Sequence, residues 1–148
     1  MPTRLAARPI LTLLCLPLCA VAVAACGSTT TSTASFKGEQ HEVAQTISNL
    51  QSEATAGEAQ KICKNLLAGS VTARLNAASR SSSGGGCTQA VKSQLTEVDS
   101  PELTIESVQL HGGASASAMV KGTYAGKSRV STITLVKEGG KWKISGLG

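Results

Sequence analysis

The sequence predicts an α+β domain over residues 37–148, in which N-terminal helices pack on one face of a curved antiparallel sheet. Three observations lead to this prediction. Apolar residues recur at helical spacing as far as residue 95. From residue 102 onward they alternate with polar residues, and glycines separate the alternating segments. Helices followed by consecutive strands are typical of this class, because neighbouring strands can pair and leave one face for the helices.

Four helices are expected before the strands. The first is followed by Gly57, a suitable C-cap, and the second has the most regular apolar stripe and stops at Gly69. Ser70 can cap a short third helix, and a fourth begins near Cys87. The expected apolar stripes consist of Val43, Ile47, Leu50 and Ala54; Ala59, Ile62, Cys63, Leu66 and Leu67; Val71, Leu75 and Ala78; and Val91 and Leu95.

Gly139 and Gly140 predict a two-residue hairpin, because paired glycines suit a type I′ turn. This turn fixes which residues of its two strands face each other. The expected pairs are Glu138 with Lys141, Lys137 with Trp142, Val136 with Lys143, and Leu135 with Ile144. Trp142 and Ile144 then lie on the core side of the sheet.

A second turn at Ala125 and Gly126 carries the same register into the preceding strand. It leaves a mixed outer face that can meet solvent or a partner. In the first strand the alternation changes parity, and a bulge near Glu106 reconciles the two halves.

Residues 1–25 precede the domain and have the features of an export signal. A start with Arg4 and Arg8 leads into an apolar run, and small residues stand directly before Cys26. The segment resembles a bacterial lipoprotein signal, which implies that Cys26 is diacylated and becomes the lipid-bearing N-terminus. An uncleaved anchor is the alternative, but a membrane span needs about 20 apolar residues, whereas this run is shorter and contains Pro17.

Residues 26–36 are expected to join the lipid to the domain. From Gly27 to Ser35 the chain contains only Gly, Ser, Thr and Ala, which cannot bury apolar surface. A flexible tether of this length spans about 15 to 18 Å root mean square. The domain is therefore expected close to the extracytoplasmic face of the cell membrane.

The net charge and the aromatic content of the mature chain limit its possible functions and the composition of its core. Removing Arg4 and Arg8 with the signal lowers the formal net charge from +5 to +3, which is not the balance of a nucleic-acid-binding protein. The aromatic residues are Phe36, Tyr124 and Trp142. We therefore expect an aliphatic, alanine-rich core of marginal size.

The cysteines predict one disulfide. Cys15 and Cys19 lie in the signal and Cys26 carries the lipid, so Cys63 and Cys87 remain as a pair in an oxidising compartment. Both lie on apolar helical stripes that can meet. A metal pair or a reactive thiol is the alternative, but two cysteines without clustered histidines make a poor zinc site.

Three short segments carry a resemblance to a known family: CKNLL from Cys63 to Leu67, CTQAV from Cys87 to Val91, and GGKWKISGL from Gly139 to Leu147. With the order of helices and strands, they are similar to small lipoproteins of the nuclear transport factor 2-like (SnoaL-like, NTF2-like) superfamily from high-GC Gram-positive bacteria. The resemblance implies a cone, in which a bent sheet wraps helices around a cavity that some members use for binding or catalysis. Many members dimerise. This chain lacks an obvious hairpin between its early helices, so the resemblance does not predict the size of any cavity.

The same resemblance directs attention to acids and histidines, because enzymes of the superfamily place a carboxylate inside the cone. The candidates are Asp99, Glu106, His111 and His41. Each also has an ordinary explanation as a polar turn or surface residue. We therefore predict no catalytic residue, no metal site and no cofactor.

Arg129 and Tyr124 are the candidate ligand-binding residues. On the expected register they project from the core face at one end of the sheet, opposite small residues such as Gly122. There they can line the mouth of a cavity and bind an anionic head group. Alternatively, the arginine stem covers the sheet edge and its guanidinium meets water.

Together these features predict a noncatalytic binding or assembly module, tethered to the membrane through Cys26. Its sheet offers a surface for a protein partner or a second copy of the chain. The alternative is a lipoprotein with a small-ligand cavity, either a carrier of a hydrophobic or anionic ligand or a weak enzyme. An enclosed apolar pocket with a buried acid favours that alternative, and a filled core favours the first reading.

Overall fold

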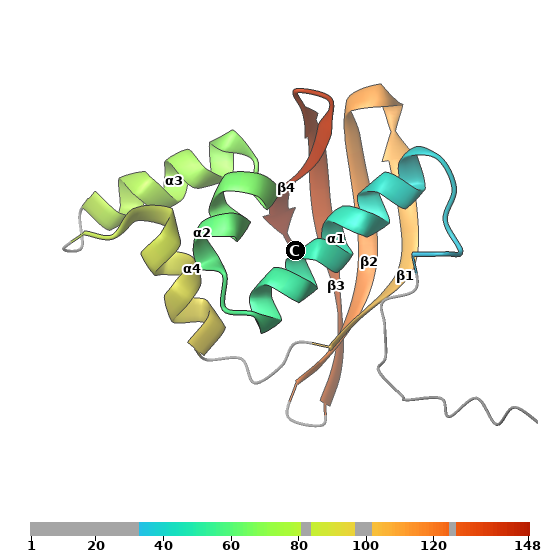
Figure 1. The fold of residues 1–148 in the computed structure, drawn as a ribbon. Coiled ribbons are helices and arrows are strands. Elements are labelled where there is room, and N and C mark those ends of the chain that lie inside the picture. Colours follow the sequence, from blue (N-terminus) through green and yellow to red (C-terminus); the bar gives the residue numbers. More distant parts are fainter. Residues whose placement is uncertain (1–32, 81–83, 97–101, 125–126) are drawn as a thin grey trace, which may run out of the picture.

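The computed structural model describes residues 33–80, 84–96, 102–124 and 127–148. Within these ranges helices come first and strands follow (Figure 1). The elements are α1 Glu39–Thr55, α2 Ala59–Lys61, the π-helical turn η1 Ile62–Leu66, α3 Gly69–Arg80, α4 Gly86–Thr96, β1 Glu102–His111, the 3-10 turn η2 Gly112–Ala114, β2 Ser115–Tyr124, β3 Lys127–Glu138 and β4 Lys141–Leu147. The predicted α+β class is confirmed.

The four strands form one antiparallel sheet in the order β1-β2-β3-β4. In Figure 1, α1 crosses one face of the bent sheet, and α2, α3 and α4 gather beyond β4. The predicted hairpin register is confirmed, with Lys137 opposite Trp142. Gly139 and Gly140 have φ of 57° and 78°, which L side chains adopt only with strain, so the turn requires its glycines. The predicted bulge is also present, between Ile105 and Ser107.

The core lies between the sheet and α1 and is almost entirely aliphatic. Trp142 is its largest side chain and is only 3% exposed. The outer face of the sheet is mixed, as predicted, with Met119 and Val130 43% and 51% exposed. The buried residues that form one cluster are Val43, Ala44, Ile47, Ile62, Leu66, Ile105, Val108, Ala116, Ala118, Val120, Ile133, Leu135, Trp142 and Ile144.

The second predicted helix is shorter and less regular than its apolar stripe indicates. It begins at Ala59 as α2, continues as the π turn, and ends at Leu66. Leu67 is extended, with ψ of 144°, and pairs in parallel with Ile144 of β4. The Ala68 N–H then donates to the Ile144 carbonyl at 2.8 Å. The helix ends because these backbone groups pair instead with the open edge of β4.

The prediction that Ser70 caps the third helix is wrong. Helix α3 already begins at Gly69, the residue that was expected to stop the preceding helix. The Gly69 N–H donates to both carboxylate oxygens of Glu138, at 3.1 and 3.3 Å. A negative group at a helix N-terminus is favourable, because the free N–H groups there carry partial positive charge.

Side-chain bonds hold the N-terminal half of α1 to the sheet. Lys137 donates to Glu39 at 2.5 Å, and this bond raises the pKa of Lys137 above its ordinary value. The Lys137 ammonium also lies 5.4 Å from the centre of the Trp142 ring. On the other side, Gln40 Nε2 donates to the Val108 carbonyl at 3.0 Å.

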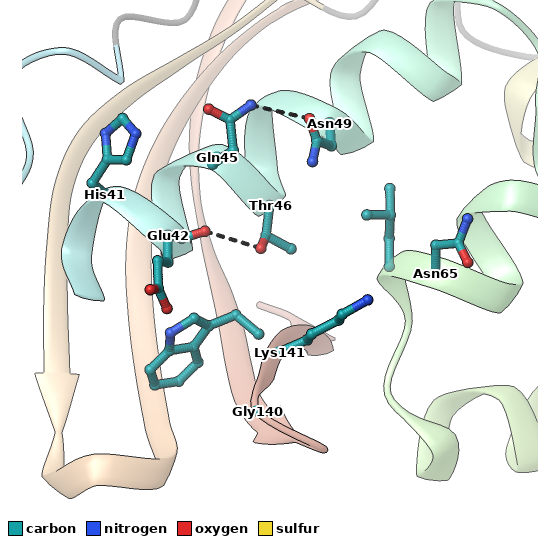
Figure 2. A pocket seen from close by; sticks show the side chains of 10 residues that line it. His41, Glu42, Gln45, Thr46, Asn49, Asn65, Gly140 and Lys141 are labelled. Carbon is teal, nitrogen blue, oxygen red and sulfur yellow. Dashed lines mark hydrogen bonds between the residues drawn. The ribbon is translucent and has the colours of Figure 1, made fainter. Parts of the chain in front are cut away.

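A polar row runs along α1 beside the start of β4 (Figure 2). Thr46 donates to the Glu42 carbonyl at 3.0 Å, and Gln45 donates to Asn49 at 3.1 Å. His41 lies at the start of the same row. The apolar stripe of α1 therefore faces the core, while the row has Thr46 buried at its inner side and its other residues exposed.

The folded part of the chain includes Phe36, which the sequence assigns to the tether. Its N–H donates to the Thr33 carbonyl at 3.1 Å, and its ring packs against the core. Burying a large apolar side chain stabilises the fold, whereas the small and polar residues around Phe36 have little apolar surface to bury. The expected signal, the lipidated Cys26 and the turn at Ala125 and Gly126 lie outside the described residues.

Candidate functional site

An apolar cavity of about 630 Å³ lies between α3, α4 and β4. Its walls are the apolar stripes of the two helices, with Val71 and Leu75 on one side and Val91 and Leu95 on the other. Val91 and Leu95 pack against the core, as expected, but they are only half-buried because one side of each lines the cavity. Ala90 is part of the wall, and its methyl group leaves room that a larger residue would fill.

The opposite wall and the rim come from the rest of the fold. Ile62 of η1 and Ile144 of β4 are buried and line the cavity from the core side. At the rim are Ser93, Gln94 and Leu147, and Leu147 is 73% exposed. Of the described residues that line the cavity, none is ionisable. The site is therefore suited to apolar contacts, with a hydroxyl and an amide at its edge.

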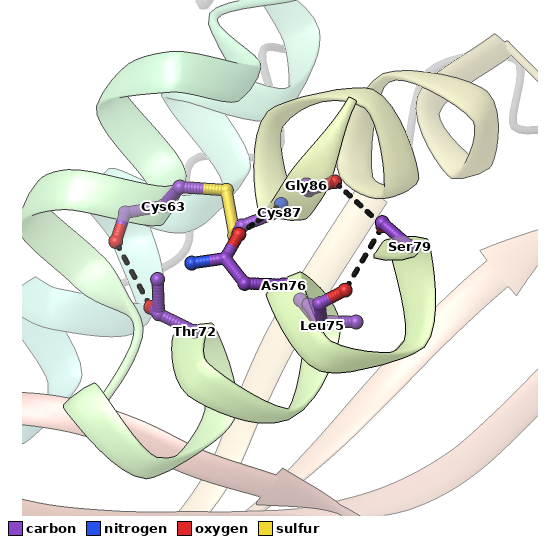
Figure 3. The surroundings of a disulfide bond; sticks show 7 residues. All are labelled: Cys63, Thr72, Leu75, Asn76, Ser79, Gly86 and Cys87. Carbon is purple, nitrogen blue, oxygen red and sulfur yellow. Dashed lines mark hydrogen bonds between the residues drawn. A yellow bond between two sulfur atoms is a disulfide. The ribbon is translucent and has the colours of Figure 1, made fainter. Parts of the chain in front are cut away.

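The disulfide between Cys63 and Cys87 fixes α4 against η1 (Figure 3). The two sulfurs are bonded, as the sequence predicts, and the Cα atoms are 6.1 Å apart. Asn76 accepts the Cys87 N–H at 2.8 Å, and Thr72 donates to the Cys63 carbonyl at 3.4 Å, so α3 is bonded to both halves of the disulfide. Gly86 has no side chain to obstruct this contact, since a Cβ there would lie 2.6 Å from the Asn76 oxygen.

Of the two predicted ligand-binding residues, Arg129 is not among the described residues that line this cavity. Arg129 is exposed and pairs with Gly122, as the register predicts, but it lies outside the described lining of the cavity. The reason is its position near the end of β3 away from the helices, where the core face of the sheet is uncovered. The Tyr124 side chain lies outside the described part of the chain.

The acids and histidines considered as catalytic candidates are dispersed. Glu106, His111 and His41 are exposed, and Asp99 lies outside the described residues. His111 contacts the Ser117 hydroxyl at 2.7 Å, and His41 contacts the Thr33 carbonyl at 3.1 Å. No group of three or more His, Cys, Asp or Glu residues that could hold a metal ion occurs in the described ranges.

The cavity itself was not predicted as a specific site, although the sequence contains a signal for it. The stripes of α3 and α4 are short, no aromatic residue lies on either helix, and Ala90 stands between larger residues. Side chains of this size cannot fill the space between two helices and a strand. A shortage of volume at positions expected to be buried is therefore the signal.

Comparison with known proteins identifies the fold but not the family. A scan against protein-family models finds no match, and no curated protein is significantly similar in sequence. The chain is similar in structure to an NTF-2-like protein of unknown function from Silicibacter pomeroyi DSS-3, with a TM-score of 0.52 and 15% identity over 76% of this chain and 96% of that one. A variant of a protein named Rd1NTF2 gives a TM-score of 0.49 and 16% identity over 74% of this chain and 97% of that one. The fold is therefore NTF2-like, as the sequence resemblance implies.

None of the helices in the described ranges is both long enough and apolar enough to cross a bilayer.

Proposed function

We propose that this protein is a noncatalytic lipoprotein of the cell envelope whose domain carries a small apolar ligand in the cavity between α3, α4 and β4. The observation that supports this proposal is the cavity itself. Its volume of about 630 Å³ and its apolar lining match the sites that bind small molecules, which range from about 300 to 1,000 Å³. Of the functions considered from the sequence, the apolar cavity supports the carrier, and the absence of an acid from its described lining speaks against the weak enzyme.

The chemistry of the lining supports a noncatalytic role and a neutral ligand. General acid–base catalysis needs a titratable group within hydrogen-bonding reach of the substrate, and the described lining offers none. A charged head group inside the cavity would lose its hydration without gaining a partner. The ligand should therefore place an apolar part inside and any polar part near Ser93 and Gln94 at the rim.

Filling the cavity should abolish ligand binding. In Ala90→Phe the larger side chain occupies the space between the helices, so the affinity of the full-length chain for the neutral dye Nile red should fall at least about tenfold, since the lost apolar contacts are worth about 1.5 to 3 kcal/mol. Fluorescence titration measures this. The matched control is Ala77→Phe, which adds the same ring at an exposed position of α3. Equal affinities of the two variants would contradict the proposal.

The anchor has its own test. In Cys26→Ala the acyl acceptor is missing, so the chain should stay unprocessed and carry no fatty acid, whereas Cys19→Ala should be lipidated as the wild type is. Metabolic labelling with a fatty acid, followed by mass spectrometry of the N-terminal peptide, distinguishes the outcomes. Label retained in Cys26→Ala would show that the anchor is elsewhere.

The outer face of the sheet is a second surface in this proposal. Met119 and Val130 are exposed on this face. We assign to this face any protein partner or second copy of the chain, because it is the face that the helices leave uncovered.

A further inference from the structure

A second cavity, of about 430 Å³, lies between α1, η1 and the start of β4 (Figure 2). It shares no lining residue with the apolar cavity, and its composition is different. Leu66 and Trp142 are its buried apolar residues. Most of its other residues are polar, and they include two of opposite charge, Glu42 and Lys141. We call it the polar groove.

The two charges stand on different sides of the polar groove. Glu42 comes from α1 and Lys141 from β4, and Figure 2 shows the Lys141 side chain extending toward Asn65, away from the Glu42 carboxylate. Within the described part of the chain, neither group takes part in an ion pair. Lys137, which Glu42 also influences, is already bonded to Glu39. Glu42 and Lys141 are therefore both available in the same cavity, whereas the His41 ring, which also lines it, contacts the Thr33 carbonyl.

Neutral hydrogen-bonding groups lie between the charges. Gln45 donates to Asn49 at 3.1 Å, which leaves the Gln45 carbonyl as an acceptor and the Asn49 amide as a donor. Thr46 is buried, and its hydroxyl oxygen can accept a bond while it donates to the Glu42 carbonyl. These groups can bond to peptide N–H and C=O groups.

Trp142 provides an independent observation. Its Nε1 is buried and has no hydrogen-bond partner among the described residues, although the ring lines the polar groove. A buried donor without a partner is uncommon, because it loses its bond to water on folding. The ring lies against the floor of the polar groove, so a ligand bound there should change the surroundings of the ring.

We propose that the polar groove binds a small zwitterion, such as a short peptide, with its ammonium group at Glu42 and its carboxylate at Lys141. Opposite charges on opposite sides favour a ligand that carries both, because a ligand of one sign would meet one attractive and one repulsive group. The apolar residues below the charges contact its backbone carbons. This site is separate from the carrier cavity and does not depend on it.

The tryptophan makes the site directly measurable, since Trp142 is the only tryptophan in the sequence. Adding triglycine to the full-length chain should change the Trp142 emission in a saturable way. N-acetyl-triglycine lacks the ammonium group and triglycine amide lacks the carboxylate, so each should bind about tenfold more weakly or worse. Isothermal titration calorimetry provides the same affinities and detects binding that leaves the emission unchanged.

Matched variants assign the two charges. Glu42→Gln should bind triglycine no better than wild type binds the N-acetylated peptide, and Lys141→Gln should do the same for the amide. Glu106→Gln and Lys127→Gln, which remove the same charges from exposed positions outside the polar groove, should bind as wild type does. All four positions are exposed, so thermal midpoints should stay close to wild type.

Three results would overturn the proposal. The first is the absence of saturable triglycine binding by either method. The second is equal affinity for triglycine and both blocked peptides, which would mean that Glu42 and Lys141 do not bind the terminal charges of the peptide. The third is binding of the neutral sugar N-acetylglucosamine in place of the peptide, which would assign the polar groove to another class of ligand.

Discussion

Replacing both Cys63 and Cys87 with alanine should lower the thermal midpoint of unfolding by at least about 10 °C. The disulfide joins residues 24 apart in sequence, and closing a loop of this length stabilises a fold by about 3 to 4 kcal/mol in the chain-entropy model. Each kcal/mol shifts the midpoint of a small domain by about 4 to 8 °C, and a domain of this size lies near the lower of these values. Thermal unfolding followed by circular dichroism measures the change.

The control separates the covalent bond from the packing of the two sulfurs. Reduced wild type keeps both side chains but lacks the bond, so its midpoint should fall nearly as far as that of the double variant. Thiol titration then tests the bond itself on a denatured, unreduced chain that begins at residue 27 and contains only Cys63 and Cys87. Two free thiols in that titration would disprove the disulfide.

Losing the disulfide should also affect the apolar cavity. Cys87 lies one turn before Ala90 and Val91, which line the cavity, and Cys63 directly follows Ile62, which lines it from the other side. The bond therefore holds two walls of the cavity at a fixed separation. In the double variant the affinity for Nile red should fall below that of wild type even at temperatures where the domain is folded.

The disulfide and the hairpin register could be predicted because neither depends on how distant parts of the chain pack together. Two glycines at Gly139 and Gly140 permit one kind of turn, and that turn decides which side Trp142 takes. Cys63 and Cys87 lie on helical stripes whose burial follows from their spacing alone. For the register a few neighbouring residues contain the whole signal, and for the disulfide the pairing follows from counting the cysteines left after the signal and the lipid site.

The departures from prediction come from contacts between distant residues. Glu138 lies 69 residues from Gly69, yet its carboxylate binds the N–H group at which α3 begins. Ser70 is therefore not the N-cap that the sequence predicts. Leu67 leaves its helix because β4 offers an unpaired edge at Ile144. The sequence does not show that Glu138 meets Gly69 or that Ile144 meets Leu67, because both contacts form only when the hairpin packs against the helices.

The two cavities were missed for the same reason. An apolar stripe predicts that residues such as Val71 and Val91 turn inward, but not that a cavity remains beside them. Likewise, Glu42 and Lys141 are ordinary surface charges in the sequence, and the fold alone places them in one groove. Sites made by facing elements depend on the volume left between them, which a one-dimensional pattern does not contain.

Trp142→Ala should leave the domain largely unfolded at room temperature. Trp142 is 3% exposed in a core that is otherwise aliphatic, and truncating a buried tryptophan costs about 3 to 5 kcal/mol. Typical domains have a stability of about 5 to 15 kcal/mol, and a small one lies toward the lower end. The change also removes the ring beneath the Lys137 ammonium, which holds the hairpin to α1 through Glu39. Urea unfolding measured by circular dichroism gives the loss of stability.

The control for this variant must come from the opposite face of the sheet. Lys143 follows Trp142 on that face, but its ammonium bonds to the Asn65 carbonyl, so it is not neutral. Thr132 is exposed there, and Thr132→Ala should change the stability by less than about 0.5 kcal/mol. In wild type, the Trp142 emission should be blue-shifted and resist quenching by acrylamide, because water does not reach a buried ring. If the emission is water-like and Trp142→Ala is as stable as Thr132→Ala, the register of β3 and β4 is wrong, and both cavities that β4 lines are wrong with it.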